Sequence, residues 1–235
     1  MQSEIKPAFL AAGNLPSVLR RALAGRVYDT VRHPALHGPE SFHPDMQMFS
    51  AGDGRMVCCP ELYPHYSGLL PARGLRCGST PLAADYPRNI AYNALRVGSR
   101  LFCLRAHTDP VILRMAEDCG WTVVDVKQGY ANCSAAPVGT DALITADPSI
   151  ASAARGQGLD VLRIAPGHIR LDGYPYGFIG GCCGLVSERS LYVFGSFAAH
   201  PDGARIQAFL DKHGVNAVFA AAQPLSDYGS LLRVT

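Results

Sequence analysis

The chain has 235 residues, 48% of them hydrophobic, and a formal net charge of +2, which predicts a single well-buried domain over residues 1–235. Its Lys and Arg residues are scattered and no apolar run reaches the ~18 residues of a membrane span, so nucleic-acid and membrane partners are disfavoured. The first seven residues lack the charged-then-apolar pattern of a signal peptide, and we therefore expect a cytoplasmic protein.

In chain order, a helix over 16–23 and a strand over 27–31 are predicted first. Four units of one pattern follow, each with a strand, a Gly- or Asp-containing turn and a second strand. These strand pairs are predicted at 45–49 and 56–59, 90–95 and 101–104, 133–138 and 142–145, and 178–186 and 191–194. The turn Gly52-Asp53-Gly54 between the first two is a strong hairpin signal.

A helix and a third strand complete most of these units. Asp109 and Pro110 mark the N-cap and first position of a helix that Gly120 ends. The helices are predicted at 109–119, 148–155 and 202–213, and the strands after them at 122–126, 160–164 and 217–220. In the first unit a Pro/Gly-rich stretch replaces the helix, and the chain ends on a strand over 230–234 that no helix follows.

A short polar or small-residue patch opens each unit, and these openings recur at nearly constant spacing. Measured at positions 43, 89, 133, 182 and 227, the steps are 46, 44, 49 and 45 residues. Such a period indicates repeated supersecondary units. We predict an α/β propeller of five ββαβ units with pseudo-fivefold symmetry, whose last unit is closed by both termini. A doubly wound α/β sheet is the alternative, but the hairpin before each helix disfavours it.

Equivalent positions of such a ring meet on its axis, so the openings are the candidate functional residues. On a strand, His43 and Asp45 would share a face, and a carboxylate commonly orients an imidazole. Cys133 lies between two polar residues, as a reactive thiol requires. The ordinary alternatives are a turn-capping histidine and a buried strand cysteine.

Other polar residues of the openings are candidates for binding. Gln47 would point the same way as Asp45, and Asn89 and Asn93 would lie on one side of a strand, where buried amides need partners. Asp45 and Asp227 would each begin a strand, and both also fit turn or capping roles.

The remaining motifs indicate little further chemistry. No C-x-x-C pair is present, which disfavours a structural zinc site, although three or four axial groups could instead bind zinc. No phosphate-binding Gly motif indicates a cofactor. Cys182 or Cys183 is an alternative reactive thiol, with a packing role favoured. Seven histidines are expected at the surface: His33, His37, His65, His107, His168, His200 and His213.

The repeated units, His43-Pro44-Asp45 and Asn132-Cys133-Ser134 resemble the pentein superfamily of guanidino-group-modifying enzymes. That superfamily includes arginine and agmatine deiminases, dimethylarginine dimethylaminohydrolases and amidinotransferases. The segments 128–134, 176–181 and 227–230 are similar to those of a bacterial branch of it. The resemblance extends from residue 40 to nearly the end of the chain, and it implies a small-molecule substrate.

The resemblance also implies roles for the candidate residues. Cys133 would be the nucleophile, His43 the general acid and base, and Asp45 a further catalytic residue. The substrate would be bound by Gln47, Asn89, Asn93, Asn132 and Asp227. The order of these residues along the chain departs from the usual order in the superfamily, in which the catalytic cysteine follows the histidine and lies near the C-terminus.

Two functions are therefore considered from the sequence. The first is hydrolysis of a guanidine or amidine C–N bond, or amidino transfer, by a cysteine nucleophile. The second is non-catalytic binding of a small molecule or a protein, because the resemblance extends to ribosome-associated pentein proteins. The oligomeric state does not follow from the sequence.

Overall fold

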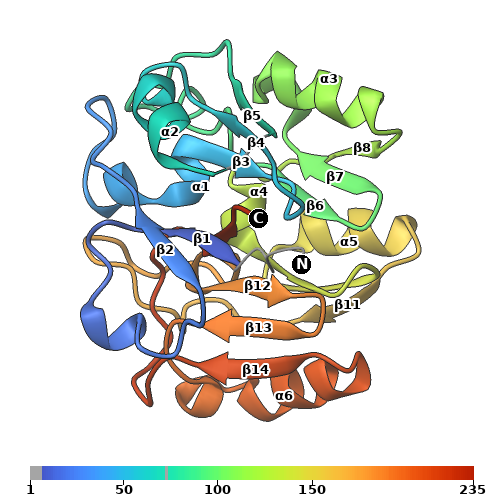
Figure 1. The fold of residues 1–235 in the computed structure, drawn as a ribbon. Helices are drawn as coiled ribbons and strands as arrows, with labels where there is room; N and C mark the ends of the chain where they lie inside the picture. Colours follow the sequence, from blue (N-terminus) through green and yellow to red (C-terminus); the bar gives the residue numbers. More distant parts are fainter. Residues whose placement is uncertain (1–6, 72–73) are drawn as a thin grey trace, which may run out of the picture.

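The computed structural model describes residues 7–71 and 74–235 and contains five three-stranded sheets arranged around a central region (Figure 1). Their strands are β3 (Met48–Ser50), β4 (Arg55–Cys58) and β5 (Gly74–Cys77); β6 (Leu95–Val97), β7 (Arg100–Cys103) and β8 (Thr122–Asp125); β9 (Ala135–Val138), β10 (Ala142–Thr145) and β11 (Asp160–Arg163); β12 (Cys183–Ser187), β13 (Ser190–Val193) and β14 (Asn216–Phe219); and β15 (Leu232–Arg233), β1 (Ala8–Ala11) and β2 (Arg26–Asp29). The predicted α/β propeller of five units is confirmed.

Every sheet is paired in the same way. Its first two strands are antiparallel, and the third is parallel to the middle one, as where Leu143 of β10 pairs with Pro137 and with Val161. A parallel neighbour requires a crossover connection, and in four units this connection contains a helix on the outside of the ring (Figure 1). The helices are α2 (Tyr63–Leu69), α3 (Pro110–Asp118), α5 (Pro148–Gly156) and α6 (Gly203–Lys212).

The fifth sheet joins the two ends of the described chain. β15 pairs antiparallel with β1, and β1 pairs parallel with β2, as the predicted closure by both termini requires. The helix predicted over 16–23 is reduced to the 3₁₀ turn Ser17–Leu19. The prediction also missed β1, a short, fully buried run, and α2 within the Pro/Gly-rich stretch. The residues 1–6, on which the signal-peptide reading partly relied, lie outside the described residues.

The openings of three units are helical turns rather than strands, and the other two, at 89–93 and 226–229, are irregular turns and bends, which corrects the prediction. The short helices α1 (Pro44–Gln47) and α4 (Ala131–Ser134) and the 3₁₀ turn Gly180–Cys182 each precede the first strand of a unit. Asp45 therefore does not share a strand face with His43, which is the N-cap of α1. A proline at the first helical position, as Pro44 is here, favours a helical turn at this point.

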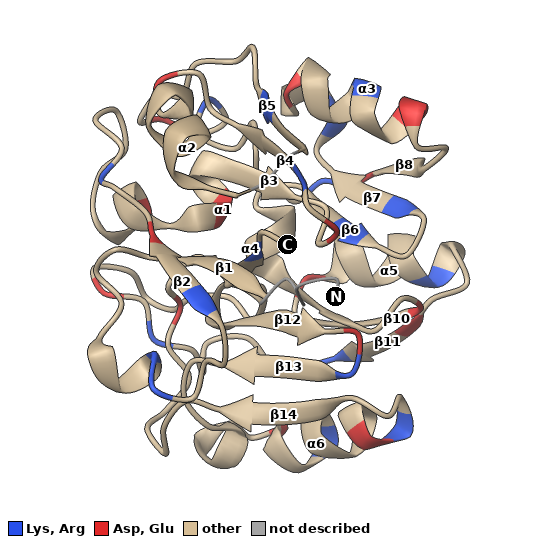
Figure 2. Cartoon of the chain, in the orientation of Figure 1, with Lys and Arg blue, Asp and Glu red and all other residues tan. Residues whose placement is uncertain are grey.

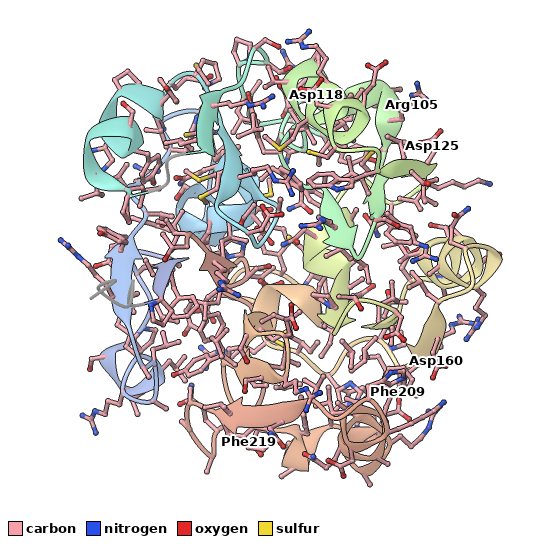
Figure 3. All side chains as sticks on the ribbon, turned by 45° about the vertical axis from the view of Figure 1, so that its right-hand side comes forward. Arg105, Asp118, Asp125, Asp160, Phe209 and Phe219 are labelled. Atoms are coloured by element: carbon pink, nitrogen blue, oxygen red, sulfur yellow. The ribbon has the colours of Figure 1, made fainter. Side chains whose placement is uncertain are left out.

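Charged groups lie mainly on the outer elements. Figure 2 shows both signs on α3 and α6, and an acidic residue on α1. At the rim between two units, Asp160 of β11 lies 2.6 Å from Lys212 Nζ and 2.9 Å from His213 Nε2. Asp160 and Phe209 of α6 are labelled in this region of Figure 3. No described helix is long and apolar enough to cross a membrane.

Two histidines expected at the surface are buried. His33 and His200 are 0% and 5% exposed. In each, Nδ1 accepts a hydrogen bond from a backbone N–H two residues later, at 3.2 Å in His33 and 3.0 Å in His200. This local bond satisfies one ring nitrogen and lets a turn histidine enter the interior.

Candidate functional site

The carboxylate of Asp45 lies at the centre of the hub, which we define as the region where the openings of the units meet. Its Oδ2 accepts hydrogen bonds from Ser230 Oγ (2.7 Å), Cys133 Sγ (3.0 Å) and Asn132 Nδ2 (3.1 Å). The residue is 1% exposed, and its Oδ1 has no hydrogen-bond partner among the described residues. Burial raises its pKa, because removal from water disfavours the charged form. Asp45 is thus a competent proton acceptor.

Asn93 orients the segment that carries Cys133. Its Oδ1 accepts hydrogen bonds from the backbone N–H groups of Asn132 (2.8 Å) and Cys133 (3.2 Å), at the start of the short helix α4. Its Nδ2 donates to Cys133 Sγ at 3.1 Å and to the carbonyl oxygen of Asp45 at 3.1 Å. One amide therefore connects α1 to α4 and fixes the sulfur.

In the free protein, the side chain of Cys133 is a protonated thiol. Burial raises its pKa well above the ordinary value, and the nearby charges of Asp45 and Asp227 raise it further. Cys133 is 4% exposed. The thiol donates a hydrogen bond to the carboxylate of Asp45, and positive charge placed beside it would lower its pKa.

His43 and Asp227 form the second part of the hub. Their Nδ1 and Oδ1 atoms are 3.9 Å apart, beyond hydrogen-bond distance. Asp227 accepts hydrogen bonds from the N–H groups of Phe178 and Gly229, both at 2.9 Å, and burial raises its pKa to about 6. Burial lowers the pKa of His43, so its imidazole is neutral near pH 7. Its Nε2 is buried and has no hydrogen-bond partner among the described residues.

A cavity of about 280 Å³ opens onto these groups. Its inner end is lined by Cys133, His43, Met46 and Asp227, and its outer part by aromatic and other side chains. We call the outer part the aromatic wall: Tyr130, Tyr174, Tyr176 and Phe178, with Glu40, Leu171 and Pro175 beside it. A thiol, an imidazole and a carboxylate thus line one small cavity, which is the set of groups that a covalent mechanism would use.

The structure brings together six of the eight predicted site residues. Cys133, His43 and Asp227 line the cavity, Asp45 and Asn93 form hydrogen bonds with the thiol, and Asn132 donates a hydrogen bond to Asp45. These contacts are the observed geometry, and the catalytic and binding roles stay predictions.

Gln47 and Asn89 do not line the cavity. Gln47 donates to the carbonyl oxygens of Val31 and Ser41 at 2.8 and 2.7 Å, and accepts from the Tyr66 hydroxyl at 2.7 Å. Residues two positions apart on a helix point in nearly opposite directions, so Gln47 faces away from Asp45 in α1. Asn89 reaches the cavity only through Tyr130, whose hydroxyl it contacts at 2.9 Å.

The sequence prediction missed Ser230, Glu40 and the aromatic wall. Ser230 donates to Asp45 Oδ2 and accepts from Asn132 Nδ2 at 2.8 Å. It follows Asp227 by three residues in the last opening, which was the available signal. Tyr176 and Phe178 were noted only as part of a motif, because nothing local indicates that their loop crosses the hub.

The other candidate thiols and metal ligands do not line the cavity. Cys182 and Cys183 direct their sulfurs to the carbonyl oxygen of Ile179, at 3.1 and 3.2 Å, which suits packing. Among the described residues, the ligand atoms of His33, Cys59 and Glu61 lie within 4.8 Å of one another.

The tautomer of His33 disfavours metal ligation in this cluster. Since His33 Nδ1 accepts a backbone N–H, the neutral ring carries its proton on Nε2, the nitrogen needed for a metal. A hydrogen bond from Cys58, together with the nearby His33, lowers the pKa of Cys59 to about 6, although burial acts to raise it.

Solved structures with the same fold are amidinotransferases and a dimethylaminohydrolase. The amidinotransferase SxtG from Microseira wollei matches with a TM-score of 0.54 and 12% identity, covering 99% of this chain and 95% of that one. The inosamine-phosphate amidinotransferase StrB1 from Streptomyces griseus matches with a TM-score of 0.52 and 14% identity, covering 90% and 75%. A dimethylarginine dimethylaminohydrolase variant, in adduct with S-methyl-L-thiocitrulline, matches with a TM-score of 0.54 and 12% identity, covering 97% and 99%.

Similarity in sequence leads to one family. Among proteins with curated functions, none matches this chain. The model of the family described as "Family of unknown function (DUF6873)" matches residues 17–232. The five-unit architecture and the three solved structures agree with the pentein resemblance of the sequence. The chain therefore belongs to the DUF6873 family and has the pentein fold of guanidino-group-modifying enzymes.

Proposed function

We propose that the protein modifies a guanidino or amidine group of a small molecule through a covalent intermediate on Cys133. One observation carries this proposal. The thiol of Cys133 lies 3.0 Å from the carboxylate of Asp45, and the cavity that reaches this thiol is also lined by His43 and Asp227. The structural neighbours act on such groups according to their names, which agrees with the proposal.

The first step is formation of the thiolate. A guanidinium ion that enters the cavity brings positive charge next to the sulfur and lowers the pKa of the thiol. Asp227 supports this placement, because a carboxylate matches the N–H groups of a guanidinium. The proton leaves Sγ for Asp45, whose raised pKa makes it a suitable acceptor.

Attack and loss of the amine follow. The thiolate forms a C–S bond to the central carbon, and the C–N bond to the leaving amine then breaks. The leaving nitrogen takes up a proton through His43, so that the proton lost by the thiol ends on the released amine. The enzyme is left with an S-linked amidinium on Cys133.

The second half of the reaction restores the thiol. Attack by water completes a hydrolysis, whereas attack by a second amine completes an amidino transfer. In both cases the C–S bond breaks and the sulfur regains a proton. The two outcomes are separated by supplying a primary amine and asking whether a new guanidine or only the hydrolysis product is formed.

The test uses 2-chloroacetamidine, an electrophile that mimics the planar amidine group. Intact-protein and peptide mass spectrometry should show rapid labelling of Cys133 that excess guanidine slows. The variant Cys133→Ala should lose this label, whereas Cys183→Ala, which alters a buried thiol outside the cavity, should keep it. Peptide mapping is needed because Cys77 is exposed.

Two results would contradict the proposal. Labelling of Cys133 no faster than that of Cys77, and insensitive to guanidine, would exclude an activated nucleophile. Saturable guanidine binding without any labelling of Cys133 would instead favour a non-catalytic binding protein.

A further inference from the structure

The structure points to a narrower ligand class for this cavity. We propose that Glu40 and the aromatic wall select an alkylguanidine whose tail carries a positive charge, and disfavour one whose tail carries a carboxylate. This inference rests on the proposed function, since it assumes that a guanidinium occupies the inner end beside Cys133 and Asp227.

The charges that line the cavity have one sign. Glu40 and Asp227 are acidic, His43 is neutral near pH 7 because burial lowers its pKa, and no Lys or Arg is among the described lining residues. Carboxylate ligands are usually held by arginine, lysine or free backbone N–H groups. The N–H groups of Phe178 and Gly229 are already occupied by Asp227. A ligand carboxylate would therefore find no cationic side chain and neither of these N–H groups among the described lining residues, and it would face Glu40.

Glu40 is placed to act on the outer part of the ligand. It lies in the 3₁₀ turn Pro39–Phe42, just before His43, and is half-buried. Glu40 lines the cavity together with Tyr130 and Tyr174, and its charge contributes, after burial, to raising the pKa of both hydroxyls. The half-buried carboxylate of Glu40 is therefore placed beside the aromatic wall, on the cavity that both line.

The aromatic wall supplies faces for a cationic or alkyl tail. The rings of Tyr130 and Phe178 are stacked at 27° with centroids 6.4 Å apart, and Tyr176 meets Phe178 edge-on at 6.2 Å. Tyr174 and Tyr176 are 44% and 43% exposed. The face of such a ring attracts a cation, by about 0.5–2 kcal/mol depending on desolvation. A ring face and a carboxylate together suit an ammonium group on a methylene chain.

The size of the cavity limits the ligand further. At about 280 Å³ it is at the lower end of the range for small-molecule sites. A guanidinium with a short alkyl chain and one terminal group fits this volume. The inferred class is thus a small alkylguanidine with a terminal ammonium group.

The test compares four ligands that share a guanidinium and differ in the tail. Agmatine carries an ammonium, butylguanidine a methyl group, 4-guanidinobutyrate a carboxylate, and arginine both charges. Calorimetric titration into the Cys133→Ala variant, which cannot react, should rank agmatine first and 4-guanidinobutyrate last. We expect agmatine to bind roughly five- to tenfold tighter than butylguanidine.

Substitution of Glu40 tests whether its charge causes the preference for a ligand with an ammonium tail. Glu40→Gln, made in the Cys133→Ala background, should abolish most of the preference for agmatine over butylguanidine and leave the affinity for butylguanidine unchanged. Glu188→Gln, in the exposed turn between β12 and β13, is the control and should keep the preference. Tighter binding of arginine or 4-guanidinobutyrate than of agmatine would overturn the inference, as would a preference that survives Glu40→Gln.

Failure of the proposed function has a separate signature. If 2-chloroacetamidine does not label Cys133 but the four ligands keep the expected order, the chemistry is wrong and the ligand class stands. If Cys133 is labelled and the order is reversed, the ligand class is wrong and the chemistry stands.

Discussion

The sulfur of Cys133 and Oδ2 of Asp45 are 3.0 Å apart, although their residues are separated by 88 positions in the chain. The contact joins the first helical turn of one unit to that of the unit two places further along the ring. It couples the two groups electrostatically, because the charge on Asp45 contributes, after burial, to the raised pKa of the thiol. The first prediction follows from this coupling.

Replacement of Asp45 by Asn should make the thiol more acidic and the protein inactive. Removing the negative charge removes one cause of the raised thiol pKa, so more thiolate is present at a given pH. Alkylation of Cys133 by iodoacetamide, followed between pH 6 and 9, should therefore shift to lower pH. Turnover of a guanidine substrate should fall at least ~100-fold, because the proton acceptor is lost.

Asp172→Asn is the matched control for this experiment, since Asp172 is an exposed carboxylate paired with Arg170 at 2.8 Å. Its alkylation profile should equal that of the unaltered protein. An unchanged or higher pH midpoint in the Asp45→Asn variant would mean that the carboxylate does not govern the thiol.

Replacement of His43 by Gln should separate labelling from turnover. Labelling by 2-chloroacetamidine needs only the thiol and the bound amidine, so it should persist. Turnover requires proton transfer to the leaving amine, and its loss should be about 10²- to 10⁴-fold. Rapid labelling with full turnover in His43→Gln would exclude the imidazole from the reaction.

The buried carboxylate of Asp227 should make stability depend on pH in a specific direction. Its pKa is about 6 in the folded protein and about 3.9 in an unfolded chain, so the folded state binds more protons between these values. This contribution is fully present below pH 4 and is lost as the pH rises through 6, with a magnitude of roughly 3 kcal/mol. Asp227→Asn cannot titrate and should not show the loss.

Thermal or urea unfolding at pH 4.5 and 7.5 measures this effect. The difference in stability between Asp227→Asn and the unaltered protein should shift in favour of the variant at the higher pH. The comparison is needed because His43 acts in the opposite direction. Burial lowers its pKa, so its contribution is present above the unfolded value of about 6.5 and is lost as the pH falls below that value toward the folded pKa. An equal difference at both pH values would contradict the raised pKa of Asp227.

The parts of the fold that local chemistry determines were predictable from the sequence. Asp109 caps α3 through a 2.8 Å bond from the N–H of Val111, with Pro110 at the first helical position, as expected. The hairpin at Gly52-Asp53-Gly54 joins β3 to β4. The repeat period then fixed which distant openings meet, and it predicted that Cys133, His43 and Asp45 lie together at the hub.

The predictions that were wrong or missing concern short elements and long loops. A single helical turn such as α1 or α4 is too short to show a 3.6-residue periodicity, and the sequence pattern predicts a strand there instead. This error reversed the direction predicted for Gln47. The loop that carries Tyr174 and Phe178 has no periodic pattern, and its position over the hub follows from tertiary contacts, such as the bond from Phe178 N–H to Asp227.

The contact between Gly229 and His43 gives a last prediction, in which two glycines with similar backbones are compared. Gly229 has φ +72° and Gly214 has φ +64°. A Cβ at Gly229 would lie 2.2 Å from Cβ of His43, whereas a Cβ at Gly214 would meet nothing within 4 Å. Both substitutions to Ala incur the left-handed backbone cost of about 1–2 kcal/mol, but only Gly229→Ala must also displace His43.

We therefore expect Gly214→Ala to lower the melting temperature by a few degrees and to retain turnover. Gly229→Ala should be destabilised further and should lose turnover as strongly as His43→Gln, while Cys133 remains reactive toward iodoacetamide in the folded protein. Because the two variants share the backbone strain, their difference isolates the position of the imidazole. Equal turnover in both variants would mean that the position of His43 against Gly229 is not required for the reaction.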